Sequence, residues 1–192
     1  MIASLSRKVA SKLHSSGAIE EADQALYEYA LNVALSGILH LGTSIVLGAA
    51  FGIIPASLAL FIPFILIRKF AGGFHASTPL RCYLFSVAMI TLLLAVLKFV
   101  PSPPILPYAV VLAVSAVVIC LAAPVDTKAK PLAAKEKKVF KAISILLCCI
   151  LAALSPILYF WGLKQIGFAV CLSLGLEAFI LGIALAGRLR SA

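Results

Sequence analysis

The sequence has few charged residues, few histidines and none of the ligand spacings typical of structural metal sites. Only 12% of its 192 residues are charged, and it holds three histidines and five cysteines. A closed zinc site takes about four ligands, commonly in CxxC or HxxxH patterns, and neither pattern occurs. The number of cysteines is odd, and four of them lie inside long apolar runs, so we expect no disulfide framework. We predict neither a metal nor another cofactor.

Acidic residues are also scarce, which leaves the chain with a formal net charge of +9. In a soluble protein that charge would suggest a nucleic-acid partner. Here, however, 63% of the residues are hydrophobic and the mean hydropathy is +1.14, whereas soluble proteins are about half apolar. The basic residues flank apolar segments, so the positive-inside rule accounts for them and we predict no nucleic-acid partner. The composition predicts an all-α, polytopic membrane protein with a single domain, residues 1–192.

Residues 1–24 are polar and carry sparse apolar residues at roughly helical spacing. The apolar positions are Ile2, Leu5, Val9 and Leu13, with Arg7, Lys8 and Lys12 between them. This pattern predicts an amphipathic helix on an anionic membrane surface, and a poorly ordered tail is the alternative. Because the next apolar run begins far downstream, we expect no cleaved signal peptide.

Six apolar segments follow within residues 25–192 and predict a helical transmembrane bundle. They are residues 27–54, 56–67, 80–100, 105–123, 142–161 and 166–186. The second is short for a span at about 1.5 Å per residue. It crosses the membrane if its helix continues through Phe70, and it is re-entrant otherwise. Residues 124–141, which contain six lysines, are predicted to form a polar loop.

The distribution of basic residues predicts the orientation of this bundle. With the N-terminus inside, all of the 16 basic residues except Lys98 and Lys164 fall on the inner side, as the positive-inside rule requires. If residues 56–67 did not cross, the basic residues before and after them would lie on opposite sides. The charges therefore favour a crossing and place both termini in the cytoplasm. The polar stretch at residues 68–82 then lies at the cytoplasmic surface of the membrane.

This polar, glycine-rich stretch carries the residues for thiol chemistry. His75 and Cys82 lie seven residues apart, and such a pair suggests a thiolate nucleophile with its base; a plain connecting loop is the alternative. Thr78 and Pro79 form a helix-start signal, an N-cap followed by the first helical residue. Cys82 then lies about one turn inside the helix, where the helix N-terminus and Arg81 favour a thiolate.

A continuous helix through this stretch would keep the two groups apart. Seven residues of helix extend about 10 Å, whereas proton transfer needs a separation of about 3 Å. The chain between His75 and Cys82 must therefore depart from a helix, and Gly72, Gly73 and Pro79 allow that departure. The two glycines can also leave room for a substrate backbone or offer amide donors to an oxyanion.

Two blocks of the sequence resemble the accessory gene regulator B (AgrB) family. The first is Arg-Lys-Phe-Ala-Gly-Gly-Phe-His at residues 68–75, followed seven residues later by Cys82. The second is Ala-Pro-Val-Asp-Thr-Lys-Ala-Lys-Pro-Leu at residues 123–132. The order of the blocks, the chain length and the six-segment hydropathy are also similar, so the resemblance covers nearly the whole chain.

The resemblance implies a cysteine endopeptidase of the bacterial cell membrane. Members of the family process a small pro-peptide, AgrD, into a cyclic autoinducing peptide for quorum sensing. The family's catalytic pair falls on His75 and Cys82. The supporting or substrate-binding candidates are Arg68 and Gly73, which match its motif, with Gly72 and Arg81 beside them. The partners that we expect are an AgrD-like pro-peptide and the anionic lipid of the inner leaflet, with a homodimer left open.

The implied reaction has two stages. Attack of the thiolate on a peptide carbonyl gives a thioester and releases the C-terminal fragment of the pro-peptide. A second nucleophile in the same peptide then captures the acyl group and closes a ring. A thiol gives a thiolactone and a hydroxyl gives a lactone, and capture must outrun hydrolysis, so the pocket should limit water.

Glu177 keeps a different hypothesis open. It lies near the middle of the sixth segment, where an ionisable group needs a partner or a role. We predict that it hydrogen-bonds to His40, directly or through water, and separate backbone or hydroxyl partners are the alternative. A small transporter or channel with a polar path through His40 and Glu177 is the competing function. The other cysteines, which we expect to be inert, are Cys120, Cys148, Cys149 and Cys171.

Overall fold

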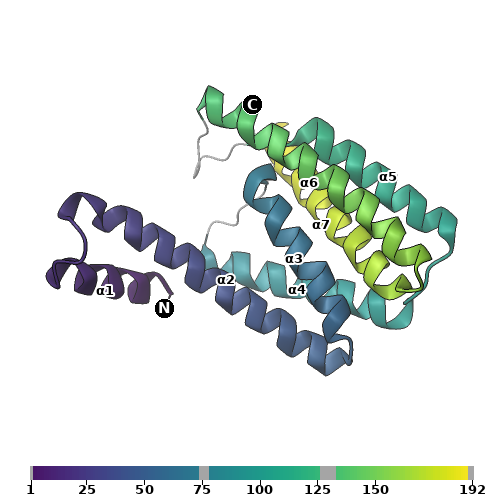
Figure 1. Cartoon of the computed structure of the whole chain (residues 1–192), viewed down its shortest axis with the longest axis horizontal. Coiled ribbons are helices and arrows are strands. Elements are labelled where there is room, and N and C mark those ends of the chain that lie inside the picture. Colours follow the sequence, from purple (N-terminus) through teal and green to yellow (C-terminus); the bar gives the residue numbers. More distant parts are fainter. Residues whose placement is uncertain (1, 74–77, 126–132, 190–192) are drawn as a thin grey trace. The chain divides into compact units, whose positions relative to one another are not determined.

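The computed structural model describes residues 2–73, 78–125 and 133–189, and these parts are almost entirely helical (Figure 1). The helices are α1 (Ile2–Ser15), the short 3-10 helix η1 (Glu21–Asp23), α2 (Gln24–Phe51), α3 (Ile54–Ala71), α4 (Pro79–Phe99), α5 (Ile105–Ala122), α6 (Ala134–Phe160) and α7 (Lys164–Leu189). No strand occurs in the described residues, which confirms the all-α prediction. Within the same residues, six helices are long and apolar enough to cross a membrane, as predicted.

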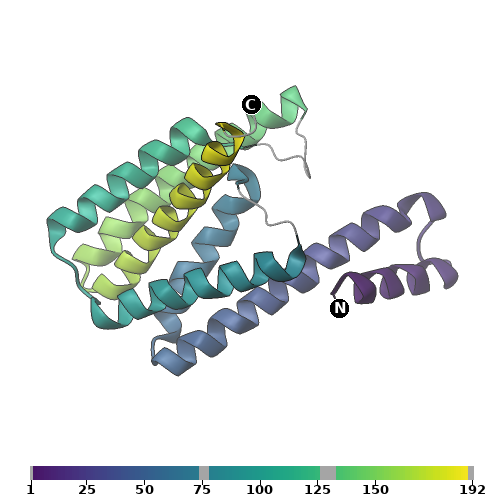
Figure 2. The same cartoon turned by 180° about the vertical axis from the view of Figure 1, so that it is seen from behind.

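The chain divides into two compact units, Met1–Thr43 and Ser44–Ala192. In the first unit, α1 lies beside the beginning of α2 in both views (Figures 1 and 2), and Arg7 Nε lies 3.2 Å from Glu28 Oε1. The predicted N-terminal helix is therefore confirmed. Its buried positions are Ser6 and Ala10, whereas Leu5 of the predicted apolar stripe is exposed. Its place on a membrane surface stays a prediction, as does the single-domain organisation.

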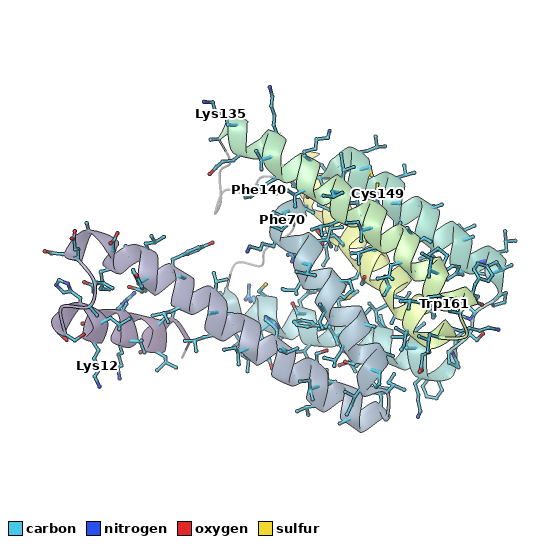
Figure 3. All side chains as sticks on the ribbon, viewed as in Figure 1. Lys12, Phe70, Lys135, Phe140, Cys149 and Trp161 are labelled. Carbon is cyan, nitrogen blue, oxygen red and sulfur yellow. The ribbon has the colours of Figure 1, made fainter. Side chains whose placement is uncertain are left out.

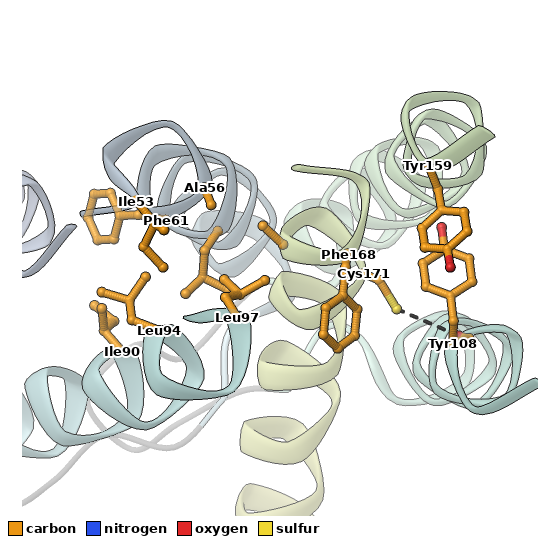
Figure 4. Close-up of a cluster of buried hydrophobic side chains, with 12 residues drawn as sticks. Ile53, Ala56, Phe61, Ile90, Leu94, Leu97, Tyr108, Tyr159, Phe168 and Cys171 are labelled. Atoms are coloured by element: carbon orange, nitrogen blue, oxygen red, sulfur yellow. Dashed lines mark hydrogen bonds between the residues drawn. The ribbon is translucent and has the colours of Figure 1, made fainter. Parts of the chain in front are cut away.

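In the second unit, α7 is the central helix, and α3, α5 and α6 pack against it. Figures 1 and 2 show α5, α6 and α7 side by side. Gly167 allows α6 to approach α7 closely, because a Cβ there would lie 2.7 Å from the Ser155 carbonyl oxygen. A cluster that includes Phe61, Ile90 and Leu94 fills the space between α3 and α4 (Figure 4). This packing holds α3 and α4 next to the central helix.

Contacts at its two ends show that successive helices of this unit alternate in direction. At one end, the Val125 amide donates a hydrogen bond of 2.9 Å to the Ala71 carbonyl oxygen. At the other end, Gln165 Nε2 donates to the Leu97 carbonyl oxygen at 3.0 Å. The helix α3 runs from the second end to the first. It continues through Phe70 to Ala71, as the full-crossing interpretation of residues 56–67 requires.

Two predicted boundaries were wrong. The first apolar segment does not continue to Ile54, because α2 ends at Phe51 and Gly52 turns the chain with φ +71°. Pro55 then lies in the first turn of α3, where its missing N–H costs nothing. The predicted segments, residues 27–54 and 56–67, leave this proline out, whereas the structure includes it in α3.

The predicted polar loop at residues 124–141 was also too long at its C-terminal side. α6 begins at Ala134, and the Ala133 amide donates to Glu136 Oε2 at 3.1 Å, as in one half of a capping box. Lysine and glutamate are good helix formers, so the helix extends beyond its apolar part. The side chain of Lys135 projects from this extension into open space (Figure 3). Lys128 and Lys130, in the loop, lie outside the described residues.

Candidate active site

The beginning of α4 forms as the helix-start signal predicted. Thr78 is the N-cap, and its Oγ1 accepts a hydrogen bond of 3.3 Å from the Arg81 amide. Pro79 is the first helical residue. The Cys82 amide donates to the Thr78 carbonyl oxygen at 3.0 Å. Cys82 is therefore the fourth residue of α4, in its first turn, with a half-buried side chain.

Cys82 lines a pocket between α3, α4 and α7. The pocket is open at one side, and the empty space at this site, about 380 Å³, includes open solvent outside its walls. The polar or charged residues of its lining are Arg68, Cys82 and Ser86, and the apolar ones are Phe64, Phe85, Met89, Ile90, Leu176 and Ile180. The pocket thus combines a thiol and a guanidinium with mostly apolar walls, an arrangement common in ligand sites.

Arg68 reaches into this pocket from the last turn of α3 and has contacts on several sides. Its Nη1 donates to the Gly72 carbonyl oxygen at 3.2 Å. The same nitrogen lies 3.8 Å from Glu177 Oε2 of α7. The guanidinium carbon lies 5.9 Å from the centroid of the Phe64 ring. The structure therefore brings two residues of the predicted motif, Arg68 and Cys82, into one pocket.

The two motif glycines have conformations and surroundings that exclude a side chain. Gly72 has φ +75° and Gly73 has φ +121°, values that L-residues with a Cβ rarely adopt. A Cβ on Gly72 would lie 2.5 Å from the Val125 carbonyl oxygen. A Cβ on Gly73 would lie 2.9 Å from Arg68 Nη1 and 2.9 Å from Ile180 Cγ2. Gly72 thus lets Val125 approach the end of α3, and Gly73 lets the chain continue without displacing Arg68.

The same turn joins the two sequence blocks in space. Gly72 forms an isolated parallel bridge with Val125, and Val125 belongs to the second block. Ala123, Pro124 and Val125 are all buried, so the beginning of that block packs into the bundle beside the motif. The distance between the blocks along the sequence therefore does not reflect their distance in the fold.

Residues 6–181 match the family described as Accessory gene regulator B (AgrB). The chain belongs to the AgrB family. Protein FsrB of Enterococcus faecalis (strain ATCC 47077 / OG1RF) is 27% identical over 125 residues, which cover 65% of this chain and 52% of that protein. The chain thus spans about half the length of this curated relative. No solved structure gives a significant match.

Of the predicted site residues, Arg68 and Cys82 line the pocket, whereas Gly72 and Gly73 do not. In this AgrB-family protein, the predicted base, His75, lies outside the described residues. Arg81 is exposed at the start of α4 and does not line the pocket. The suggestion that Gly72 offers its amide to an oxyanion is wrong, because this amide donates to the Arg68 carbonyl oxygen at 3.1 Å. Gly72 ends α3 instead, as glycine often does.

Glu177 was singled out in the sequence, and the structure places a charged side chain beside it. Its side chain is fully buried, and neither carboxylate oxygen accepts a hydrogen bond from the residues that the structure describes. The charge beside Glu177 is that of Arg68. His40 belongs to the first compact unit and Glu177 to the second, so a hydrogen bond or a transport path between them stays a prediction.

Helical spacing in the sequence could have identified further residues that line the Cys82 pocket. Ser86 and Met89 lie four and seven residues after Cys82, which places them on the same face of α4. The other cysteines lie elsewhere, and none lines the pocket. Cys148 and Cys171 are buried, whereas Cys149 is exposed on α6 (Figure 3). This agrees with their predicted status as core or lipid-facing residues.

Proposed function

We propose that this AgrB-family protein is a membrane-embedded cysteine endopeptidase that cleaves a small AgrD-like pro-peptide and promotes its cyclisation for quorum sensing. The observation that carries the proposal is the position of Cys82. Its thiol lies in the first turn of α4 and lines a mostly apolar pocket together with Arg68. A thiol at a helix N-terminus beside a cation has the surroundings of a nucleophile.

In the first stage, Cys82 is the nucleophile and His75 the base. His75 takes the thiol proton, and the sulfur attacks the carbonyl carbon of the scissile peptide bond. When the tetrahedral intermediate collapses, the carbon–nitrogen bond breaks and His75 returns the proton to the leaving amine. The N-terminal part of the pro-peptide stays on Cys82 as a thioester, and the C-terminal fragment leaves.

In the second stage, a thiol or hydroxyl of the bound peptide attacks the thioester carbonyl. The new bond closes a thiolactone or lactone ring, and the Cys82 thiol is regenerated. Apolar walls favour this outcome, because hydrolysis needs water in the pocket. The lining by Phe64, Phe85 and Met89 therefore supports cyclisation over simple cleavage.

Arg68 supports the first stage by its charge. The negative charge that develops on the carbonyl oxygen is stabilised by a cation or donor fixed nearby. Arg68 lines the same pocket as Cys82 and hydrogen-bonds to the backbone of Gly72. We assign Gly72 and Gly73 a supporting role, because the Gly72 carbonyl oxygen accepts the Arg68 hydrogen bond and the missing side chain of Gly73 leaves the space that Arg68 occupies.

Mass spectrometry after co-expression tests this function. We expect that cells expressing the chain together with a candidate small pro-peptide, sought among the genes beside its own, contain a peptide lacking the C-terminal fragment. Its mass should be lower by one water than that of the linear acid, because ring closure replaces hydrolysis. A matched culture with pro-peptide alone should contain only the uncut form. An uncut pro-peptide in both cultures would reject the peptidase function.

The site would face the cytoplasm of a bacterial cell. The motif turn and the Val125 segment lie at one end of the bundle, and most basic residues adjoin that end in sequence. Lys98 and Lys164 lie near the opposite end, where Gln165 bonds to Leu97. The positive-inside rule then places the motif end, with its lysines, against the anionic inner leaflet.

Cysteine labelling from the two sides of the membrane tests this orientation. We expect an impermeant maleimide added to intact cells to label Ser102→Cys, and to label Ala133→Cys only after the membrane is opened. Both positions are exposed in the structure, so access to the reagent depends on the side alone. Peptide mass spectrometry separates these labels from those on the native cysteines. The reverse pattern would contradict a cytoplasmic active site.

A further inference from the structure

We propose that Glu177 is a positioning residue for this reaction, which holds the Arg68 guanidinium in the wall of the Cys82 pocket. The inference rests on the proposed peptidase function. It adds to that function a residue from the central helix α7, far from the motif in sequence. Arg68 remains the group that faces the substrate, and Glu177 acts through it.

The burial of Glu177 within a membrane span indicates that its carboxyl group has a partner or a function. Its side chain is fully buried, in the span Lys164–Gly187. A buried polar group in a membrane span costs free energy unless it is paired, and such residues usually have a function. The paired cation is Arg68, with Nη1 at 3.8 Å from Glu177 Oε2.

The neighbours of Glu177 on α7 connect it to the pocket. Leu176, the preceding residue, and Ile180, three residues later, both line it. Glu177 therefore lies directly behind the apolar wall that these two residues form. From this position its charge attracts the guanidinium toward α7, across the space between α3 and α7.

The geometry indicates attraction between charges rather than a fixed hydrogen bond. A separation of 3.8 Å exceeds the usual hydrogen-bond distance of about 2.7–3.2 Å. The close donor contact of Arg68 Nη1 is to the Gly72 carbonyl oxygen, at 3.2 Å. Gly72 thus sets where the guanidinium sits near α3, and Glu177 draws it toward α7.

Gly73 makes this placement sterically allowed. A Cβ at Gly73 would lie 2.9 Å from Arg68 Nη1, closer than van der Waals contact permits. The side chain of Arg68 is 16% exposed, so it is close enough to solvent to turn outward without its anionic partner. Loss of the Glu177 charge is therefore expected to release Arg68 from the pocket rather than to unfold the bundle.

A double-mutant cycle tests whether Glu177 acts through Arg68. We expect Glu177→Gln to lower kcat/KM for the pro-peptide roughly 10- to 100-fold, as displacement of a positioned group does. Glu177→Asp, which keeps the charge, should retain more activity. Arg68→Lys should also impair the enzyme, and the double variant should be no worse than the more impaired single variant. Ser173→Ala, another buried polar substitution on α7, is the control and should leave the rate unchanged.

If the fold-loss in kcat/KM of the double variant equalled the product of the two single losses, the inference would be overturned, because the two residues would then act independently. Wild-type activity of Glu177→Gln would overturn it as well. Both results are distinct from failure of the peptidase function, in which the wild-type protein itself would not cleave the pro-peptide.

A second measurement needs no peptide substrate. Iodoacetate is an anion and iodoacetamide is neutral, but both alkylate the same thiol. The rate with iodoacetate divided by the rate with iodoacetamide at Cys82 therefore increases when the local potential is more positive. We expect this ratio to fall roughly three-fold or more in Glu177→Gln, because the cation leaves the pocket. If Arg68 stayed in place, removal of the carboxylate would raise the ratio, and the inference would be wrong. Cys149, exposed on α6, serves as an internal reference in the same mass spectra.

Discussion

Replacement of Cys82 by alanine is expected to abolish cleavage of the pro-peptide while the protein still inserts into the membrane. The proposed acyl-enzyme needs the sulfur, and loss of a covalent nucleophile lowers rates at least about a thousand-fold. Cys82→Ser should be nearly as inactive, because a hydroxyl is far less ionised than a thiol. Initial rates of fragment release, normalised to the amount of protein in the membrane, measure the effect.

The matched control is Cys149→Ala, which removes a thiol from the exposed face of α6 and outside the pocket. We expect this variant to cleave at the wild-type rate. Cys82 is only half buried, so its truncation should cost little stability. Near-normal cleavage by Cys82→Ala would remove Cys82 as the nucleophile, whatever the control shows.

Gly72→Ala is expected to have the largest effect on stability among substitutions of the motif. Its backbone angles, φ +75° and ψ −143°, lie close to a region that is almost exclusive to glycine, so alanine there costs about 1–3 kcal/mol. The added Cβ would also lie 2.5 Å from the Val125 carbonyl oxygen. This is a backbone atom, so relief requires the Ala71–Val125 hydrogen bond to open, at a further cost of about 1 kcal/mol. Thermal unfolding in detergent should show a lower midpoint, and activity should fall because Gly72 positions Arg68.

Gly162→Ala distinguishes the cost of the backbone conformation from the cost of the steric contact with Val125. Gly162 also has a positive φ, +90°, but a Cβ there would meet nothing within 4 Å in the described structure. It therefore carries the backbone cost without the contact with Val125. We expect Gly162→Ala to lower the midpoint less than Gly72→Ala and to leave cleavage intact. Equal shifts would show that the approach of Val125 to Gly72 has no energetic importance.

The contrast with Gly73→Ala follows from the kind of atom that the new methyl would meet. At Gly73 the neighbours are Arg68 Nη1 and Ile180 Cγ2, which are ends of side chains and can move. The positive φ still costs stability. The specific effect of the methyl, however, should be on the position of Arg68 and so on catalysis. The two adjacent glycines thus have different functions, although the sequence shows only a pair.

Local physical chemistry explains what could be predicted from the sequence. Long apolar runs identify the six spans, because a helix is the one way for a single segment to satisfy its backbone in lipid. The cap at Thr78 and the start of α4 at Pro79 depend on neighbours in the chain. The placement of Cys82 in the first turn followed from them. Where hydropathy alone set a boundary, as at the beginning of α6, the prediction failed, because polar helix formers extend a helix beyond its apolar part.

The composition of the pocket was decided by the tertiary structure. The sequence identified Glu177 as an unusual residue, and depth along the spans suggested His40 as its partner. The structure places Arg68 beside it, because α3 packs directly on α7 and an arginine side chain is long enough to reach between helices. In the same way, the contact of Gly72 with Val125 depends on the packing of both α3 and α5 against α7, which brings the segments after these two helices together. Such pairings are set by which helices lie side by side, and by the reach of their side chains, and neither property is encoded in the spacing of residues along one segment.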